Sequence, residues 1–195
     1  MSLVLSEMKG NDFGRIEEGT YPARIAQVVD FGVQPQTDYQ TGEPTKSKER
    51  LMITWEFPTE RIELENDEGT QSLPRWLGKE FTISPSEMSN LMKLVSSLAP
   101  RASSLDELLN MPCSVQVGST SGGKAKVVNV APIMKGMEVA ELENDSTYFD
   151  FSHPNEDLFK VLPLWQRNKI KDAENYNGFA DDWVVESDAE KSEDY

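Results

Sequence analysis

Hydrophobic and polar residues alternate along several stretches of the chain, as they do in β-strands with one buried face. The clearest case is 51–58, LMITWEFP, in which Leu51, Ile53, Trp55 and Phe57 share one face. Because Trp55 has the parity of these apolar neighbours, we expect it in the core rather than on a binding surface. Patterns of this kind predict strands at 20–33, 51–58, 76–84, 112–119 and 124–133.

The first predicted strand, 20–33, changes parity along its length. Its apolar residues move from one face, at Ala23 and Ile25, to the other, at Ala26 and Val28. An extra residue in a strongly curved strand produces such a shift, because it displaces the following side chains by one position. We therefore predict a β-bulge within this strand.

After the third predicted strand, the apolar residues change to helical spacing. Ser84, Pro85 and Glu87 form a helix-start pattern with Ser84 as the N-cap. The helical spacing continues until Pro100 ends the helix, and 103–109 predicts a second, short helical turn. The apolar positions of the main helix are Met88, Leu91, Met92, Val95 and Leu98.

The polar stretch at 34–47 predicts an exposed hairpin loop, the stretch at 59–74 predicts a second long loop, and 120–123 predicts a hairpin turn. The resulting order, three strands, one helix and two strands, is that of a five-stranded barrel of the oligonucleotide/oligosaccharide-binding (OB) type. SH3-like barrels and parts of β-sandwiches can show the same order. We predict a mainly β fold with an OB-like barrel at 19–137, preceded by a flexible segment at 1–18.

The region after the barrel divides into a packed part and a polar part. We expect 138–176 to form an extension that packs on the barrel, with a short helix near 163–173. The segment 177–195 is polar and acidic, which predicts a disordered tail whose deletion leaves folding intact. The apolar anchors expected in the extension are Phe149, Phe151, Leu158, Phe159, Leu162 and Trp165.

Negative charge dominates the composition. The net charge of the 195 residues is −15, and acidic side chains are concentrated in 60–68 and 174–195. Phosphate binding depends on Lys and Arg, so the net charge by itself argues against a nucleic-acid partner. The uneven distribution nevertheless leaves room for a basic face on the barrel.

Several classes of protein do not fit the sequence. We expect no membrane span and no signal peptide, and therefore a cytoplasmic location. The single cysteine, Cys113, lies in an apolar alternation that predicts a buried thiol, and the single histidine, His153, has no nucleophile nearby in sequence. We therefore expect no enzymatic activity, no cofactor and no metal site.

Five segments, taken in order, carry a family resemblance. They are GTYPARIAQVVDFGVQ, LMITWEF, FTISPSEMSNLMKLV, PCSVQV with GGKAKVVNVAPIMKGM, and FDF followed by VLPLWQRNKIKDAENY. Together they span roughly 19–176 and resemble a family of bacteriophage proteins that bind single-stranded DNA. The resemblance implies an OB fold, DNA binding without sequence preference, a role in phage DNA replication or recombination, and a place in the host cytoplasm.

The expected DNA-binding residues follow from the assumed OB fold. Single strands are held by positive charge and by aromatic rings on which bases stack. In an OB barrel the binding face crosses the second and third strands, between the loops that join strands 1–2 and 4–5. Scattered basic residues can also form a merely solvated surface, and Trp76 fits packing as well as binding. The predicted residues are Tyr39, Lys46, Lys48, Arg50, Arg75, Trp76, Lys79, Lys124 and Lys126.

The acidic tail, which ends in an aromatic residue, is similar to the tails of bacterial and phage single-strand binders. We expect it to recruit replication or recombination proteins through Asp181, Asp182, Glu193, Asp194 and Tyr195. One alternative is an OB-like protein-interaction module, such as a virion or assembly accessory, without DNA affinity. A second is an enzyme. The oligomeric state stays open between monomer and dimer.

Overall fold

The computed structural model describes residues 16–66, 69–183 and 185. This part of the chain is mainly β, as predicted, and its main helix lies between the third and fourth strands. No helix within it is long and apolar enough to cross a membrane. The elements are β1 (Gly19–Thr37), β2 (Pro44–Asn66), β3 (Gly69–Thr82), α1 (Asn90–Leu98), η2 (Asp106–Leu108), β4 (Pro112–Ser119), β5 (Ala125–Pro132), β6 (Thr147–Phe149), α2 (Glu156–Lys160) and α3 (Leu164–Lys171).

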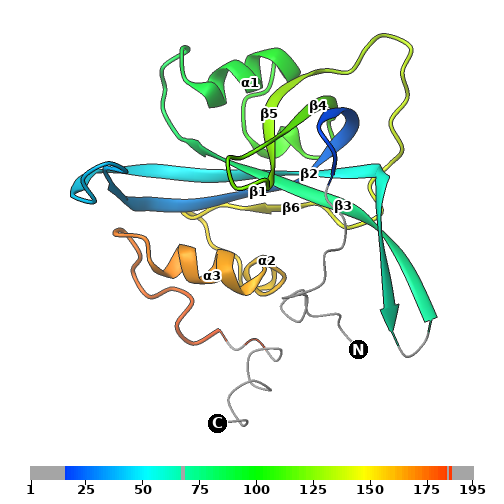
Figure 1. Ribbon diagram of the computed structural model, residues 1–195. Coiled ribbons are helices and arrows are strands. Elements are labelled where there is room, and N and C mark those ends of the chain that lie inside the picture. The colour runs from blue at the N-terminus through cyan, green and yellow to red at the C-terminus, as the bar shows by residue number, and fades with distance from the viewer. Residues whose placement is uncertain (1–15, 67–68, 184, 186–195) are drawn as a thin grey trace.

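All the strands belong to one sheet (Figure 1). Its order is β3-β2-β1-β4-β5 with antiparallel neighbours, and β6 pairs in parallel with β1. The edge strands β3 and β5 approach each other where the Lys79 Nζ donates a hydrogen bond to the Val128 carbonyl at 3.3 Å. Among the described residues no backbone ladder joins these two edges, so the sheet is open rather than a closed barrel.

Strand β1 contains the predicted bulge. Its pairing with β2 shifts register between Ile25 and Gln27, where the sequence changes parity. Ile25 and Val28 consequently face one side of the sheet, whereas Val29 and Phe31 face the other. The bulge therefore allows a single strand to contribute apolar side chains to two separate cores.

The two polar stretches predicted as loops are long antiparallel hairpins. Strands β1 and β2 stay paired out to Thr37 and Pro44, and β2 and β3 stay paired out to Asn66 and Gly69. Figure 1 shows the hairpins projecting from opposite ends of the sheet. The first stretch is a hairpin, as predicted, but in both stretches the strands extend further than expected. Most side chains there are exposed or only half-buried, which removes the alternation that marks a half-buried strand. We call the first hairpin, residues 34–48, the arm.

The first core lies on the side of the sheet that carries α1 and the β4–β5 hairpin (Figure 1). Trp55 is fully buried in it, which confirms the parity prediction. Ile16 is also buried here, so the predicted flexible segment 1–18 packs at its end, while 1–15 lie outside the described residues. The buried members are Ile16, Ala23, Ile25, Val28, Leu51, Ile53, Trp55, Phe57, Phe81, Leu91, Leu94, Ala99, Leu108, Cys113, Val115, Val117 and Val127.

Helix α1 begins later than predicted. Its N-cap is Ser89, whose hydroxyl accepts a hydrogen bond from the Met92 N–H at 3.2 Å. Ser84 instead lies in the connection before the helix, where its hydroxyl accepts from the Ser86 N–H at 3.4 Å. Met88 is 74% exposed, so a helix that began one turn earlier would not bury this apolar side chain.

The second core lies on the opposite side of the sheet, under β6, α2 and α3 (Figure 1). The predicted helix near 163–173 is confirmed by α3. Two of the six expected anchors, Leu158 and Trp165, are instead 36% and 50% exposed, and Ile170 is buried in this core. The buried members are Val29, Phe31, Phe149, Phe151, Phe159, Leu162, Ile170, Ala173 and Ala180.

The packed chain continues beyond the position predicted to start the tail. Ala180 is fully buried, and the Phe179 ring lies 4.9 Å from that of Tyr176 and 5.5 Å from that of Trp183. The prediction of disorder from 177 was therefore wrong for 177–183. The acidic residues of this stretch hide three apolar anchors, Phe179, Ala180 and Trp183, because two aspartates separate them and no regular apolar spacing results. Residues 184 and 186–195 lie outside the described residues.

Candidate nucleic-acid interface

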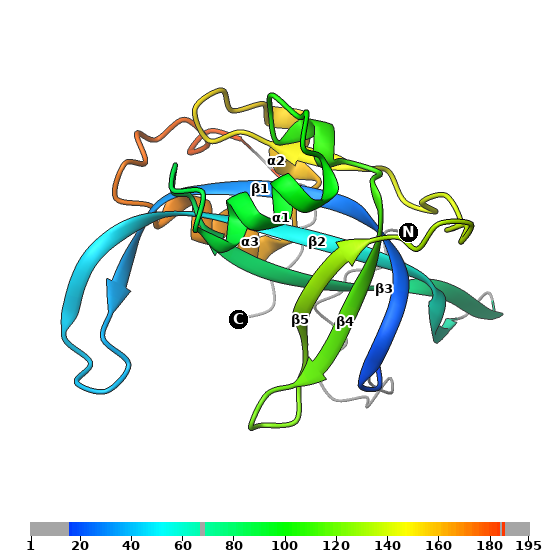
Figure 2. The ribbon, with the colours of Figure 1, turned by 90° about the horizontal axis from the view of Figure 1, so that it is seen from above.

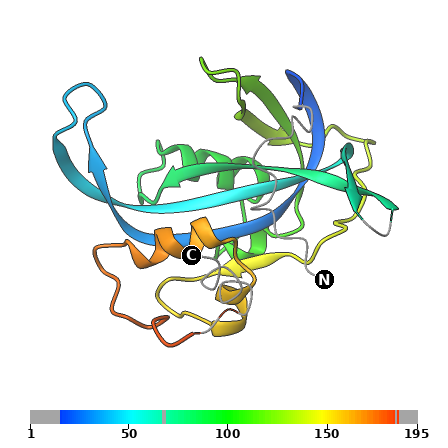
Figure 3. The ribbon, with the colours of Figure 1, turned by 60° about the horizontal axis from the view of Figure 1, so that its bottom comes forward.

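Two β-hairpins project to the same side of the molecule and carry five of the predicted DNA-binding residues. Figures 2 and 3 show the arm and the β4–β5 hairpin extending in the same direction, with the edge strand β3 between them. Lys79 lies on this part of β3. We call the set Tyr39, Lys46, Lys48, Lys79, Lys124 and Lys126 the basic strip.

The tip of the arm presents Tyr39, which is 90% exposed. The tip is shaped by Asp38, whose carbonyl accepts from the Gly42 N–H at 2.8 Å and whose carboxylate accepts from the N–H groups of Thr41 and Gln40. These backbone hydrogen bonds lower the pKa of Asp38, so the carboxylate that shapes the turn stays ionised further into the acid range. Tyr39 is thus an exposed aromatic ring at the end of a hydrogen-bonded turn.

The base of the arm is held by the C-terminal extension. The Gln34 side-chain amide donates to the Lys169 carbonyl at 2.9 Å, and the Ser47 hydroxyl donates to the Glu174 carboxylate at 2.5 Å. The Glu174 N–H in turn donates to the Val33 carbonyl at 2.8 Å. These contacts restrain both strands of the arm where it leaves the sheet, so Lys46 and Lys48 project from a braced support.

The β4–β5 hairpin presents Lys124 and Lys126, both exposed. Its turn closes through hydrogen bonds from the Thr120 N–H to the Lys124 carbonyl and from the Gly123 N–H to the Thr120 carbonyl, each 2.8 Å. Gly123 has φ of +73°, a backbone conformation that favours glycine. The turn therefore places the first lysine at the tip and the second on the strand beside it.

Lys79 links the two hairpins across the edges of the sheet. Its Nζ donates to the Val128 carbonyl on β5 and lies 5.6 Å from the centre of the Phe81 ring. Burial lowers the pKa of Lys79, and the positive charge of Lys126 lowers it further. The two ammonium groups therefore repel each other, and an anion bound between them would reduce this repulsion.

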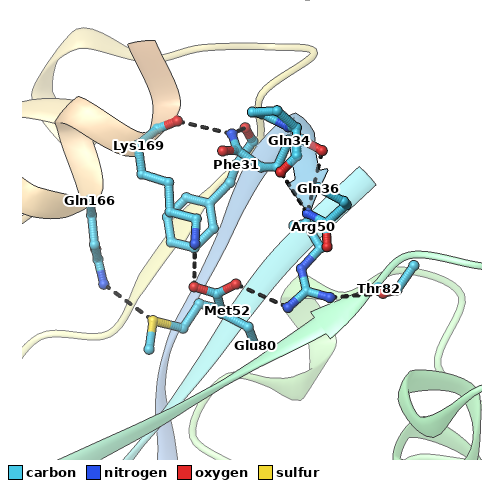
Figure 4. A network of polar contacts seen from close by, with 10 residues as sticks. Phe31, Gln34, Gln36, Arg50, Met52, Glu80, Thr82, Gln166 and Lys169 are labelled. Carbon is cyan, nitrogen blue, oxygen red and sulfur yellow. Dashed lines mark hydrogen bonds and ion pairs between the residues drawn. The ribbon is translucent and has the colours of Figure 1, made fainter. Parts of the chain in front are cut away.

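Arg50 occupies a different environment from the one predicted. Figure 4 shows its guanidinium beside the Glu80 carboxylate, 3.1 Å away, and the Thr82 hydroxyl, 2.9 Å away. Lys169 of α3 is paired with the same carboxylate. Burial opposes ionisation of Glu80, but the hydrogen bonds from Lys169 and Arg50 outweigh it and lower the pKa. Arg50 thus ties α3 to the sheet, and we remove it from the DNA-binding set.

Arg75 and Trp76 also have structural partners. The Trp76 indole N–H donates to the Glu56 carboxylate at 2.9 Å, although the ring stays 38% exposed. Glu56 is fully buried and also accepts from the Glu143 N–H and the Asn144 amide, each at 2.7 Å. The Arg75 Nε donates to a backbone carbonyl at 3.1 Å. Trp76 therefore helps to anchor the 133–146 connection through Glu56, whereas Arg75 contacts the Arg61 carbonyl on β2.

Sequence reasoning missed two residues that shape this region. Glu56 alternates with the apolar residues of 51–58, and the sequence does not show that it is buried, because its three donors come from distant positions. Val128 is the second residue, and it is 46% exposed beside Lys79. Its exposure could have been inferred only from its position directly after Val127, since adjacent strand residues usually face opposite sides.

The residues predicted to bind partners through the tail are only partly described. Asp181 accepts a hydrogen bond from the Tyr176 hydroxyl at 2.8 Å, and Asp182 is exposed. Glu193, Asp194 and Tyr195 lie outside the described residues. Within the described chain, no three His, Cys, Asp or Glu side chains gather as a metal site requires.

Comparison with protein-family models and with curated proteins finds no match to this chain.

Proposed function

We propose that the chain binds single-stranded DNA without sequence preference along the basic strip. One observation carries the proposal: two hairpins that extend in the same direction carry four exposed lysines, Lys46, Lys48, Lys124 and Lys126, and none of them has an ion pair among the described residues. By contrast, Arg50, Lys160 and Lys169 are each paired with a carboxylate. Unpaired positive charge collected on an acidic protein favours a polyanionic ligand.

Single strands fit the strip better than a duplex does. Tyr39 offers an exposed ring at the arm tip, and a base can stack on it only when the base is not already stacked and paired within a duplex. No arrangement of the strip favours particular base edges. Binding by backbone charge and stacking therefore supports the expected lack of sequence preference and a protective role in phage replication or recombination.

The strand order supports an OB-like interpretation of the sheet. A five-stranded OB barrel has strands β1 to β3 as a meander, β4 beside β1, and β5 beside both β4 and β3. Here β4 pairs with β1 and β5 with β4, and the edges of β3 and β5 meet at Lys79. We propose that the fold is a partly open OB barrel, with the arm and the β4–β5 hairpin as its two ligand-flanking connections.

The test is a titration of intrinsic tryptophan fluorescence with oligo-dT at two salt concentrations. Lys46→Glu combined with Lys48→Glu should weaken binding at least about tenfold, because it reverses the charge of the arm. Lys93→Glu combined with Arg101→Glu makes the same charge change at two exposed residues outside the strip and should have a much smaller effect. Binding that is insensitive to salt, stronger for duplex, or equally weakened by both variants contradicts the proposal.

The C-terminal residues add a proposed regulatory element. Residues 186–195 contain five acidic side chains, one lysine and a terminal tyrosine. We propose that they compete with DNA for the basic strip and recruit replication or recombination proteins. Deleting 186–195 should strengthen oligo-dT binding most at low salt, where charge screening is weakest. Equal affinity of the deleted and full-length chains at low salt would show that the residues do not compete.

A protein-interaction module without DNA affinity is the second candidate function. The observation that favours it is an exposed apolar group at the junction of α2 and α3, where Val161, Leu164 and Trp165 are 67%, 43% and 50% exposed. Apolar groups of this kind are typical of protein contact surfaces. A flat oligo-dT titration at low salt would favour this function over the first.

A further inference from the structure

The edges of β3 and β5 meet without a backbone ladder among the described residues, and a lysine bridges them. Lys79 belongs to β3 and reaches the carbonyl of Val128 on β5. The pairing of β4 with β5 shifts register at Val128, but Lys126 pairs with Gly118, and a side chain at Gly118 would meet the Val128 methyl group, so Lys126 and Val128 lie on the same face of the hairpin. Two ammonium groups from the two edge strands therefore lie near one another at this junction.

The junction lacks the counter-charge found at other half-buried cations among the described residues. Arg50 and Lys169 share the carboxylate of Glu80, and Arg61 is paired with Glu143. Neither Lys79 nor Lys126 is paired with a carboxylate among the described residues. Within the described part of the chain, the charge that lowers the pKa of Lys79 is that of Lys126, which acts by repulsion.

The geometry leaves the Lys79 ammonium ready to bind an additional group. A lysine ammonium has three donors, and the Val128 carbonyl takes one of them. Its contacts with that carbonyl and with the Phe81 ring restrain the side chain before any ligand arrives. Restrained donors lose less conformational entropy on binding than a free surface lysine does.

We infer that Lys79 and Lys126 together form one phosphate site, which holds a single backbone phosphodiester of the bound strand at the junction of β3 and β5. This inference rests on the proposed DNA binding and adds a defined contact to it. The ammonium groups supply donors and charge from two sides, and the exposed Val128 side chain offers an apolar contact to the adjoining sugar. The site would fix the position of the strand between the arm and the β4–β5 hairpin.

A salt-dependence experiment tests the shared contact. For single strands, the slope of log affinity against log salt changes by about 0.7 for each phosphate neutralised. Lys79→Gln combined with Lys126→Gln should reduce the slope by about 0.7, because the two lysines serve one phosphate; two independent contacts would remove about 1.4. Lys93→Gln, on the exposed side of α1, is the control and should leave the slope unchanged. An unchanged slope, or a loss of about 1.4, overturns the inference.

A second measurement separates the site from the proposed function. Inorganic pyrophosphate is titrated into the full chain while the lysine side-chain NMR signals are followed, and the signals of Lys79 and Lys126 should move together while that of Lys93 stays. If the chain binds oligo-dT but pyrophosphate does not shift the signals of these lysines, the proposed function stands and the phosphate site is refuted. If the signals of Lys79 and Lys126 shift together but the chain does not bind oligo-dT, the anion site stands and the proposed function is refuted.

Discussion

The two cores on either side of β1 are built from different kinds of sequence. The first core is formed mainly by neighbouring strands whose apolar residues alternate, such as Leu51, Ile53 and Trp55. The second core depends on aromatic side chains from short, separate segments, such as Phe149, Phe159 and Phe179. Regular alternation therefore specifies the first core, whereas isolated aromatic anchors specify the second core and the C-terminal extension that holds the arm.

The largest expected effect is on the first core. Trp55→Ala should lower the free energy of unfolding by about 3–5 kcal/mol, because it removes a fully buried aromatic side chain and leaves a cavity. The matched control is Trp165→Ala, since that side chain is 50% exposed and should cost much less. Urea unfolding measures both. A stable Trp55→Ala variant that has lost only DNA binding would show that the indole serves the ligand.

Truncation is expected to affect the second core next. Ending the chain after Tyr176 removes Phe179, Ala180 and Trp183 and should lower the free energy of unfolding by at least about 2 kcal/mol. Ending it after Val185 keeps these anchors and should leave the melting temperature nearly unchanged. Equal melting temperatures for the two truncations would mean that 177–183 contributes nothing to folding.

The first core provides an internal reference for these truncations. Burial raises the pKa of Cys113 to about 12, so its thiol should resist alkylation while the first core stays folded. Slow alkylation of the shorter truncation would show that the first core folds without 177–183. Rapid alkylation would show that the two cores unfold as one unit, which would weaken the distinction between them.

The smallest expected effect comes from the ion-pair network between α3 and the sheet. The pKa of Glu80 is lowered in the folded chain, so its contribution to stability is present above its ordinary value of 4.5 and is lost as the pH falls below it. Glu80→Gln should remove this contribution, about 1 kcal/mol or less for partly exposed pairs. Unfolding free energies measured from pH 7 to pH 3 should therefore converge for the two proteins in acid. Parallel curves would contradict the assignment.

The sequence predicts most of the first core, because side-chain parity is a local property. It placed Trp55 inside and located the bulge between Ile25 and Gln27. It did not predict how far the strands of both hairpins extend, since a strand with both faces exposed has no alternation. It also placed the helix cap at Ser84, whereas the structure has it at Ser89, because the start of a helix depends on what its first turn can bury.

The candidate site was predicted less completely than the fold. The lysines of the two hairpins were found because they flank predicted turns. Arg50 was assigned to the site because its partner Glu80 is on another strand and Lys169 is far along the chain, so neither contact is visible locally. Whether a cation is paired depends on tertiary contacts, and these cannot be inferred from the spacing of residues within one segment.

The position of β1 between two cores has a consequence for the chain as it is synthesised. Phe31 leaves the ribosome early, but Phe149, Phe159 and Phe179, which belong to the core that covers it, follow more than a hundred residues later. At about 5–20 residues per second, this leaves one side of the nascent strand uncovered for roughly ten seconds. During that interval Val29 and Phe31 form an apolar surface open to chaperones or to neighbouring nascent chains. Emergence of residues 149–180, rather than completion of the first core, would therefore end the period of greatest aggregation risk.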